Sequence, residues 1–138
     1  MISKNIGIVI VDDHPILRES WKIFLEREPG MEFLGACSTG HEALSLLENV
    51  RPDIMLIDVQ MKPMNGFELT SSITSTWPSI RIIGTSLNNH PNYANKMIEA
   101  GASGFVTKAS PLSEIAKAIK EVFDGRQYIC EEVRSRME

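Results

Sequence analysis

The sequence has few cysteines, which excludes a fold held together by disulfide bonds. Two cysteines, Cys37 and Cys130, occur among 138 residues, whereas small secreted domains that depend on disulfides carry many more. Two such cysteines are consistent with a reducing compartment. We interpret each of them as a small apolar side chain.

Long apolar runs and an excess of basic charge are also absent. No run approaches the roughly 20 residues that a membrane-spanning helix needs, and the N-terminus lacks the basic and apolar regions of a signal peptide. The formal net charge is −4, so the chain has no basic excess with which to bind nucleic acid or an anionic membrane. We therefore expect a cytoplasmic protein without membrane contact.

The three histidines do not have the spacing of zinc ligands. We interpret His14 and His90 as solvent-exposed loop residues and His41 as an exposed residue of a helix. The histidines therefore predict no metal site of their own.

The chain contains five short apolar runs separated by amphipathic segments. Its length suits one domain. The runs read as strands because they are short, rich in aliphatic residues and bounded by turn formers. The predicted strands are 6–11, 32–37, 54–57, 80–85 and 104–107. The predicted helices are approximately 14–28, 41–49, 66–77, 93–100 and 110–124.

The regular alternation of strand and helix predicts an α/β fold with βαβ units and a parallel sheet covered on both faces. Right-handed crossovers favour a flavodoxin-like (βα)5 doubly wound sheet with strand order 2-1-3-4-5. The mixed composition of 32–37 places that strand at an edge. We assign 1–125 to this domain and 126–138 to a C-terminal tail. The tail could form a last helical turn or two and is expected to be the start of a linker to a further domain.

Proline and glycine mark several helix ends. Pro15 suits the first turn of its helix, and Gly101 suits the C-terminal cap of the fourth. Ser110 is expected to cap the last helix, with Pro111 in its first position. Leu112 is expected to belong to the buried stripe of that helix.

The strands end in residues whose side chains can react or bind a ligand. The first runs into Asp12 and Asp13, the third ends at Asp58, the fourth at Ser86 and the fifth at Lys108. In an open parallel sheet these ends lie on one edge, where ligands bind, and the order 2-1-3-4-5 makes strands 1 and 3 neighbours. The three carboxylates are therefore expected to lie together.

Three neighbouring carboxylates need a cation or a proton, and Mg²⁺ suits oxygen ligands. Next to Mg²⁺, Asp58 can act as a nucleophile toward phosphorus and form an aspartyl-phosphate. Lys108 can supply positive charge, and Ser86 can donate a hydrogen bond to a phosphoryl oxygen. The residue types thus match a phosphoryl-accepting site.

Each of these residues alone is more often a helix cap, a turn residue or a solvated charge. Only their convergence on one edge favours the functional interpretation. A haloacid-dehalogenase-type phosphatase would need a second Asp two residues after Asp58, where Gln60 stands. A flavin or nucleotide binder would need a glycine-rich or hydroxyl-rich loop after the first strand, where this chain has two carboxylates.

The motifs resemble the receiver domain of two-component response regulators. The resemblance rests on residues 11–18, on Asp58 followed by Met61, Met64, Asn65 and Gly66, and on residues 100–108. It covers about 6–125. The Asp-Asp-His-Pro opening, Ser86 in place of Thr and the Gly-Arg-Gln-Tyr start of the tail are similar to the NarL/FixJ branch, whose receiver precedes a LuxR-type DNA-binding domain.

The resemblance implies a set of roles at the site. Asp58 would accept a phosphoryl group from a phosphohistidine of a sensor histidine kinase or phosphotransfer protein. Asp13, Asp58 and the backbone carbonyl of Gln60 would ligate Mg²⁺, and Asp12 would act through a water. Lys108 would contact the phosphate.

Ser86 would move toward the phosphate and Phe105 would change rotamer, which is a two-state switch of the face around the fourth helix. That switch would control a homodimer or a DNA-binding output domain, so DNA is expected to be bound only through a further domain, absent from this chain. The resemblance implies a phosphorelay signalling domain in transcription regulation rather than an enzyme, although it takes part in phosphotransfer and in its own dephosphorylation. A stand-alone receiver is the alternative.

Three positions depart from the family pattern. Lys62 stands four residues after Asp58, where the family usually has proline, and Pro63 follows one position later. Ala109 follows Lys108 in place of proline, so no cis-proline is expected there. Gly84 and the residue after it are smaller or more polar than the usual aliphatic pair and are expected to loosen the core behind Ser86.

Overall fold

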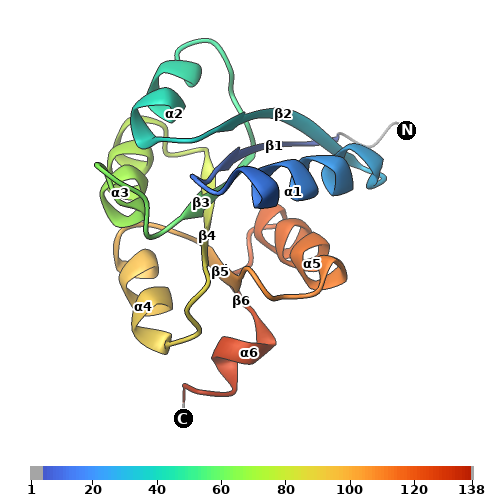
Figure 1. Ribbon diagram of the computed structural model, residues 1–138, viewed down its shortest axis with the longest axis vertical. Helices are drawn as coiled ribbons and strands as arrows, with labels where there is room; N and C mark the ends of the chain where they lie inside the picture. Colours follow the sequence, from blue (N-terminus) through green and yellow to red (C-terminus); the bar gives the residue numbers. More distant parts are fainter. Residues whose placement is uncertain (1–4, 138) are drawn as a thin grey trace.

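A six-stranded parallel sheet organises the chain in the computed structural model, which describes residues 5–137 (Figure 1). The strands lie in the order β2-β1-β3-β4-β5-β6. The strands are β1 (Ile6–Val11), β2 (Met31–Cys37), β3 (Ile54–Asp58), β4 (Arg81–Ser86), β5 (Gly104–Thr107) and β6 (Tyr128–Ile129). The helices are α1 (Pro15–Arg27), α2 (Gly40–Leu46), α3 (Gly66–Thr76), α4 (Pro91–Glu99), α5 (Leu112–Phe123) and α6 (Glu131–Arg134).

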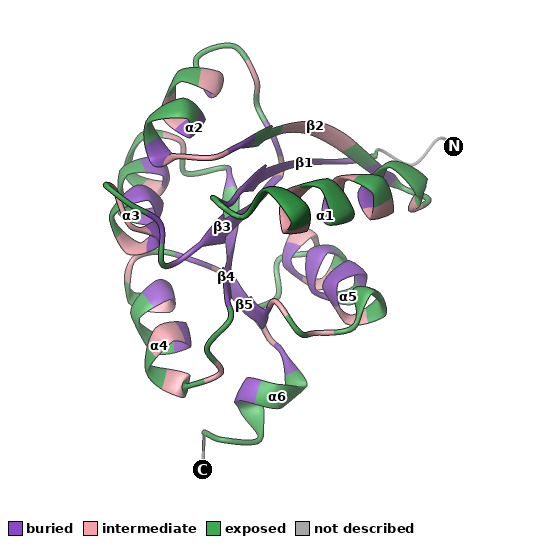
Figure 2. Ribbon diagram, in the orientation of Figure 1, coloured by how far each residue is buried: buried purple, intermediate pink, exposed green. Residues whose placement is uncertain are grey.

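The helices form a layer on each face of the sheet. Helices α1 and α5 cover one face, and α2, α3 and α4 cover the other (Figure 1). Every residue of β1, β3 and β5 is buried (Figure 2). This double burial explains why these strands are continuous apolar runs rather than alternating ones.

The flavodoxin-like order predicted for the first five strands is confirmed. β2 lies at an edge, as its mixed composition indicated, and its central residues are partly exposed. Among residues 5–137, no helix is long and apolar enough to cross a membrane.

The sixth strand was not predicted. Tyr128 pairs with Gly104 and Ile129 with Phe105, so β6 extends the sheet beyond β5. Cys130 and Val133 follow, and both are fully buried. A strand of two residues has no periodicity to reveal it, and its place in the sheet depends on the exposed edge of β5.

The start of α5 differs from the prediction. Ser110 does not cap the helix, because its Oγ accepts a hydrogen bond from Thr107 N at 3.2 Å. Pro111 is the N-cap rather than the first helical residue, and Leu112 begins the helix with 41% of its surface exposed. Leu112 therefore lies outside the buried stripe, which includes Ile115 and Ile119.

Other helix ends agree with the sequence. Pro15 occupies the first turn of α1. Gly101 follows the C-cap of α4 with a φ of 114°, a left-handed conformation that glycine adopts without a Cβ clash.

The expectation of a loose core at Gly84 is wrong. A Cβ at Gly84 would lie 2.8 Å from Met97 Cε and 3.2 Å from Phe105 Cδ2. The side chain of Met97, from α4, thus packs directly on the backbone of β4. Thr85 is only 1% exposed, so the space left by the small residue is filled.

Candidate functional site

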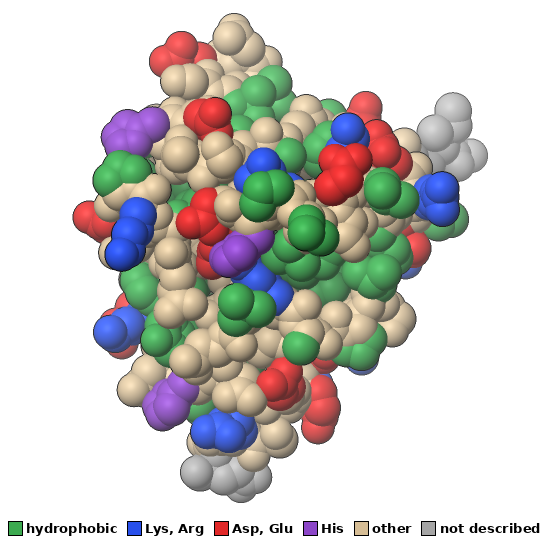
Figure 3. All heavy atoms as spheres, viewed as in Figure 1, with side chains coloured by type: hydrophobic (Ala, Val, Ile, Leu, Met, Phe, Trp, Pro, Cys, Tyr) green, Lys and Arg blue, Asp and Glu red, His purple; other side chains and the backbone are tan. Residues whose placement is uncertain are grey.

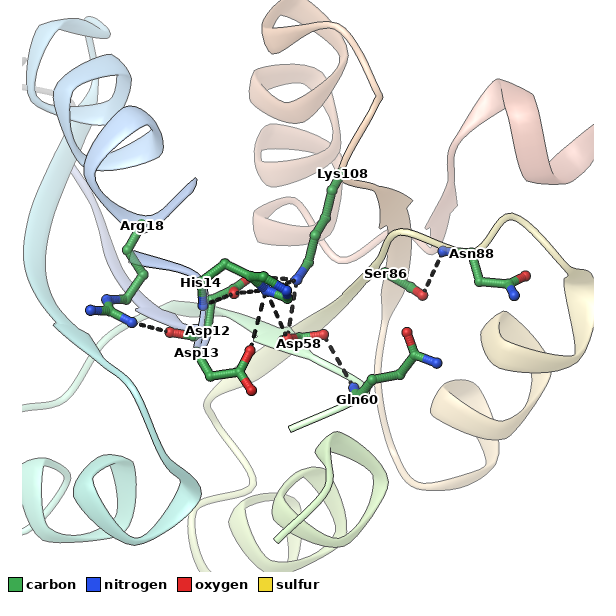
Figure 4. Close-up of polar contacts among 9 residues, drawn as sticks. All are labelled: Asp12, Asp13, His14, Arg18, Asp58, Gln60, Ser86, Asn88 and Lys108. Carbon is green, nitrogen blue, oxygen red and sulfur yellow. Dashed lines mark hydrogen bonds and ion pairs between the residues drawn. The ribbon is translucent and has the colours of Figure 1, made fainter. Parts of the chain in front are cut away.

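The carboxyl ends of β1 and β3 bring the acidic residues together. The two strands pair directly, with Val11 opposite Ile57, so Asp12 and Asp13 emerge next to Asp58 (Figure 4). The strand order also reverses at this point, because β2 lies on one side of β1 and β3 on the other. Ligands of open α/β sheets bind at such a switch point.

Lys108 lies between two buried carboxylates. Its Nζ is 2.8 Å from Asp12 Oδ2 and 3.0 Å from Asp58 Oδ2, and all three side chains are at most 3% exposed. Among residues 5–137, no well-directed hydrogen bond reaches Asp12 Oδ2 or Asp58 Oδ2. The ammonium of Lys108 therefore offsets part of the negative charge on these oxygens.

The environment of Asp58 opposes its ionisation. Burial raises the pKa of this carboxyl, and the charge of Asp12 adds to the effect. The N–H of Gln60, which donates to Asp58 Oδ1 at 3.1 Å, and the ammonium of Lys108 work in the opposite direction. Because the pKa is nevertheless raised, the Gln60 N–H and Lys108 do not compensate fully for burial and for the charge of Asp12.

The donor set fits a divalent cation. Three ionised carboxylates and one ammonium leave a charge of −2 at the site, and the side chain of Asp13 is 42% exposed and so accessible from solvent. One ligand atom each from Asp12, Asp13, His14 and Asp58 lie within 4.8 Å of one another. Buried oxygens without a directed hydrogen bond are suitable ligands for a hard cation such as Mg²⁺.

Ser86 and Phe105 lie next to the site without joining its contacts. Ser86 is fully buried, and its Oγ accepts a hydrogen bond from Asn88 N at 2.9 Å. Its carbonyl accepts from Lys108 N at 2.8 Å, which holds the ends of β4 and β5 together. Phe105 is fully buried and pairs with Gly84.

The loop after β3 folds back closely on the strand that carries Asp58. Gly66 N donates to Val59 O at 3.0 Å, and a Cβ at Gly66 would collide with the carbonyl oxygen of Asp58 and lie 2.5 Å from Val59 Cα. The Lys62–Pro63 peptide bond in this loop is cis, and Lys62 is exposed.

His14 belongs to the site, which the sequence interpretation missed. It is exposed as expected, but its Nδ1 lies 2.8 Å from Asp12 Oδ1, 3.2 Å from Asp13 Oδ1 and 3.0 Å from Lys108 Nζ (Figure 4). Its position directly after the carboxylates of the first strand was the signal that could have revealed it.

Arg18 was also missed. Its Nη1 donates to the backbone carbonyl of Asp12 at 2.6 Å from the first turns of α1 (Figure 4). The other two histidines, His41 and His90, are exposed as predicted, and His90 Nδ1 accepts a hydrogen bond from Asn92 N at the start of α4.

Residues 8–120 match the response regulator receiver domain family. The chain belongs to this family. It is 29% identical to response regulator GacA of Pseudomonas aeruginosa over 96% of its own length and 62% of that protein. It is 33% identical to transcriptional regulatory protein DegU of Brevibacillus brevis over 91% of its own length and 53% of that protein.

A solved structure gives the branch of this receiver domain. A two-component response regulator of the LuxR family from Aurantimonas sp. SI85-9A1 is 32% identical and superposes with a TM-score of 0.92, with 97% of this chain and 96% of that chain covered. This confirms the resemblance to the NarL/FixJ branch. The chain spans 53% to 62% of the length of the curated relatives named above.

Proposed function

We propose that this receiver domain accepts a phosphoryl group on Asp58 from a phosphohistidine of a sensor histidine kinase or phosphotransfer protein. The observation that carries the proposal is the cluster of Asp12, Asp13 and Asp58 at the switch point of the sheet, with Lys108 buried among them. In the transfer, a carboxylate oxygen of Asp58 forms a bond to phosphorus. The bond from phosphorus to the donor nitrogen breaks, and its electron pair stays on the imidazole.

The residues around Asp58 would have different roles in this transfer. Asp13, Asp58 and the backbone carbonyl of Gln60 would hold Mg²⁺, with Asp12 acting through a water. The bound ion would offset negative charge on the phosphoryl oxygens. Lys108 Nζ, already 3.0 Å from Asp58 Oδ2, would contact another phosphoryl oxygen. Fixed positive charges next to the phosphoryl oxygens lower the free-energy barrier to the transfer.

Phosphorylation of Asp58 would change the conformation of the face around α4. Ser86 Oγ would leave its bond with Asn88 N to donate to the phosphate, and Phe105 would follow into the space left. Such a local change of charge can bias a two-state element. The downstream response would be dimerisation or release of a DNA-binding output domain and thus transcription regulation, as the names of the relatives suggest.

Exposed apolar side chains near the site offer a surface for the phosphoryl donor. Ile16 is 86% exposed and Leu87 is 71% exposed, and they follow closely on His14 and Ser86. In the view of Figure 3, histidine, acidic and basic side chains gather near the centre of the molecule, with hydrophobic side chains beside them. Such a mixed patch suits a protein partner.

Intact mass after incubation with a small acyl-phosphate donor and Mg²⁺ tests the proposal. We expect one phosphate on the wild type, none on Asp58→Ala or Asp58→Asn, and none on the wild type without Mg²⁺. Asp124→Asn is the matched control, because Asp124 is exposed and remote from the site. An adduct that persists on both Asp58 variants would show that the acceptor is another residue.

Lys62 adds a positive charge to the loop that follows the acceptor, and we expect it to alter the lifetime of the phosphoryl group. Lys62→Ala should change the first-order rate of dephosphorylation, because a mobile ammonium near the phosphate can compete with Lys108 for its oxygens. Equal decay rates for the wild type and the variant, followed by intact mass after removal of the donor, would exclude this role.

A further inference from the structure

Two helices of this protein begin with the same dipeptide, and their histidines behave differently. His90-Pro91 begins α4, and His90 Nδ1 accepts a hydrogen bond from Asn92 N at 3.1 Å, which caps the helix. His14-Pro15 begins α1, but the side chain of His14 makes no capping bond. Its imidazole is turned toward the carboxylates (Figure 4).

The backbone holds His14 in this orientation. His14 N donates to Asp12 Oδ1 at 2.8 Å, and Arg18 Nη1 holds the carbonyl of Asp12. The residue has the extended conformation that a following proline favours, with φ −95° and ψ 105°. The imidazole is thus pre-positioned at the mouth of the acidic site, with 49% of its side chain exposed.

No hydrogen position on Nδ1 satisfies all its neighbours. With a hydrogen, Nδ1 suits the carboxylates of Asp12 and Asp13 at 2.8 and 3.2 Å but opposes the ammonium of Lys108 at 3.0 Å. With a lone pair, it accepts from Lys108 but faces the carboxylate oxygens. A cation placed among these atoms would use the nitrogen lone pair and the carboxylate oxygens together.

His14 Nδ1 is about as far from Asp13 Oδ1 as two neighbouring ligands of one ion are from each other. Ligands about 2.1 Å from a metal in octahedral geometry are roughly 3 Å from their neighbours. His14 Nδ1 is 2.8, 3.2 and 3.7 Å from one oxygen each of Asp12, Asp13 and Asp58. Two of those carboxylates also carry the buried Oδ2 oxygens, which are ion-paired with Lys108 Nζ at 2.8 and 3.0 Å and receive no directed hydrogen bond.

We propose that His14 Nδ1 is a nitrogen ligand of the metal site, and that the site therefore binds divalent transition-metal ions such as Mn²⁺ more tightly than its carboxylates alone would. The proposal rests on the metal site of the proposed function. Its chemical basis is that imidazole suits transition metals, whereas Mg²⁺ prefers oxygen ligands and keeps several waters. His14 thus sets metal preference rather than phosphoryl transfer itself.

The test compares Mn²⁺ and Mg²⁺ binding by the wild type, His14→Gln and His90→Gln. We expect His14→Gln to weaken Mn²⁺ binding by about 10-fold or more and Mg²⁺ binding by less than about 3-fold, and His90→Gln to change neither. Pulsed electron paramagnetic resonance of the Mn²⁺-loaded wild type should show coupling to a nitrogen nucleus that disappears in His14→Gln. Circular dichroism confirms that each variant is folded.

Three results would overturn the inference. Mn²⁺ that binds without nitrogen coupling would leave the carboxylate site intact and exclude His14 as a ligand. Equal losses of Mn²⁺ and Mg²⁺ affinity in His14→Gln would assign His14 a purely structural role. If the wild type bound neither ion, the metal site of the proposed function would fail as well.

Discussion

At the scale of single residues, Gly66 decides how closely the loop after β3 can approach the acceptor strand. The nearest atoms to a Cβ at this position belong to the backbone of Asp58 and Val59. Backbone cannot move aside as a flexible side chain can. The geometry around Asp58 therefore depends on the absence of a side chain at Gly66, eight positions later in the sequence.

Gly66→Ala is expected to lower the free energy of unfolding by about 1–3 kcal/mol, the usual cost of forcing extra volume into a packed site. It should also reduce phosphoryl acceptance, because the displaced backbone belongs to Asp58. Urea denaturation measures the first effect and intact mass the second. Gly35→Ala is the control, since its Cβ would meet only Leu46 Cδ2 at 3.2 Å. Equal losses for the two variants would contradict this account.

Lys108 places its ammonium next to Asp12 and Asp58, so removing it should reveal the energetic cost of burying these carboxylates. Lys108→Met is expected to lower the free energy of unfolding by about 3–5 kcal/mol at neutral pH, the range for breaking a buried ion pair. Added Mg²⁺ should restore part of this stability, because it would supply positive charge at the same carboxylates.

The loss of unfolding free energy caused by Lys108→Met should also become smaller at acid pH. The pKa of Asp58 is raised in the folded protein. A raised pKa contributes stability that is fully present below the unfolded-state pKa and is lost as the pH rises through the folded-state pKa. Without Lys108 this pKa would rise further. Urea denaturation at several pH values should show the difference from the wild type shrinking toward acid pH, and a constant difference would contradict the electrostatic explanation.

At the scale of elements, α6 is hydrogen-bonded to the loop that follows the predicted switch residue Ser86. Glu132 Oε2 accepts from Asn89 Nδ2 at 2.7 Å, and its Oε1 accepts from Thr107 Oγ1 at 2.7 Å. Asn89 lies three residues after Ser86, and Thr107 ends β5. One carboxylate thus connects the C-terminal helix to the ends of β4 and β5.

Glu132→Ala is expected to loosen α6. Loss of these hydrogen bonds should speed backbone amide exchange in α6 by about fivefold or more, equal to roughly 1 kcal/mol. Glu131→Ala is the matched control, because that side chain forms a surface ion pair with Arg134. The same exchange rates in both variants would show that the hydrogen bonds of Glu132 do not hold α6 in place.

Acid should loosen α6 in the same way. The hydrogen bonds from Thr107 and Asn89 lower the pKa of Glu132. A lowered folded-state pKa contributes stability that is present above the unfolded-state pKa and is lost as the pH falls through the folded-state pKa. We therefore expect α6 to stay docked at neutral pH and to exchange faster only below the ordinary pKa of glutamate, with a smaller acid effect in Glu132→Ala.

At the scale of the whole molecule, β6 and α6 complete the sheet and cover the edge of β5. Tyr128 is buried, and its hydroxyl donates to Glu114 Oε2 at 2.8 Å on α5. Burial and this bond raise its pKa to about 12. Cys130 and Val133 fill the space between the sheet and α6. The predicted boundary at residue 125 is therefore open to a direct test.

A chain that ends after Gly125 is expected to lose about 4 kcal/mol or more of its free energy of unfolding, since three buried side chains are removed and each contributes about 1.5–3 kcal/mol. A chain that ends after Ser135 retains β6 and α6 and should match the full length. If the chain ending at Gly125 were as stable as the longer one, residues 126–138 would be a linker, as the sequence indicated.

Much of this protein follows from the sequence alone. The continuous apolar runs reflect strands buried on both faces, and the residues that end them lie on one edge because parallel strands all point the same way. Asp12, Asp13, Asp58 and Lys108 could therefore be grouped before any coordinates. Pro15 and Gly101 act through local backbone preferences, which need no tertiary context.

Other features were decided only by the tertiary structure. His14-Pro15 and His90-Pro91 have the same local sequence, yet one imidazole faces carboxylates and the other caps a helix. Local preferences set the backbone of both, but the neighbouring strand end, with Asp58 and Lys108, determines where the ring of His14 points. The short strand β6 likewise forms only because β5 offers an unpaired edge. Both outcomes depend on contacts between residues far apart in the chain, which no local pattern encodes.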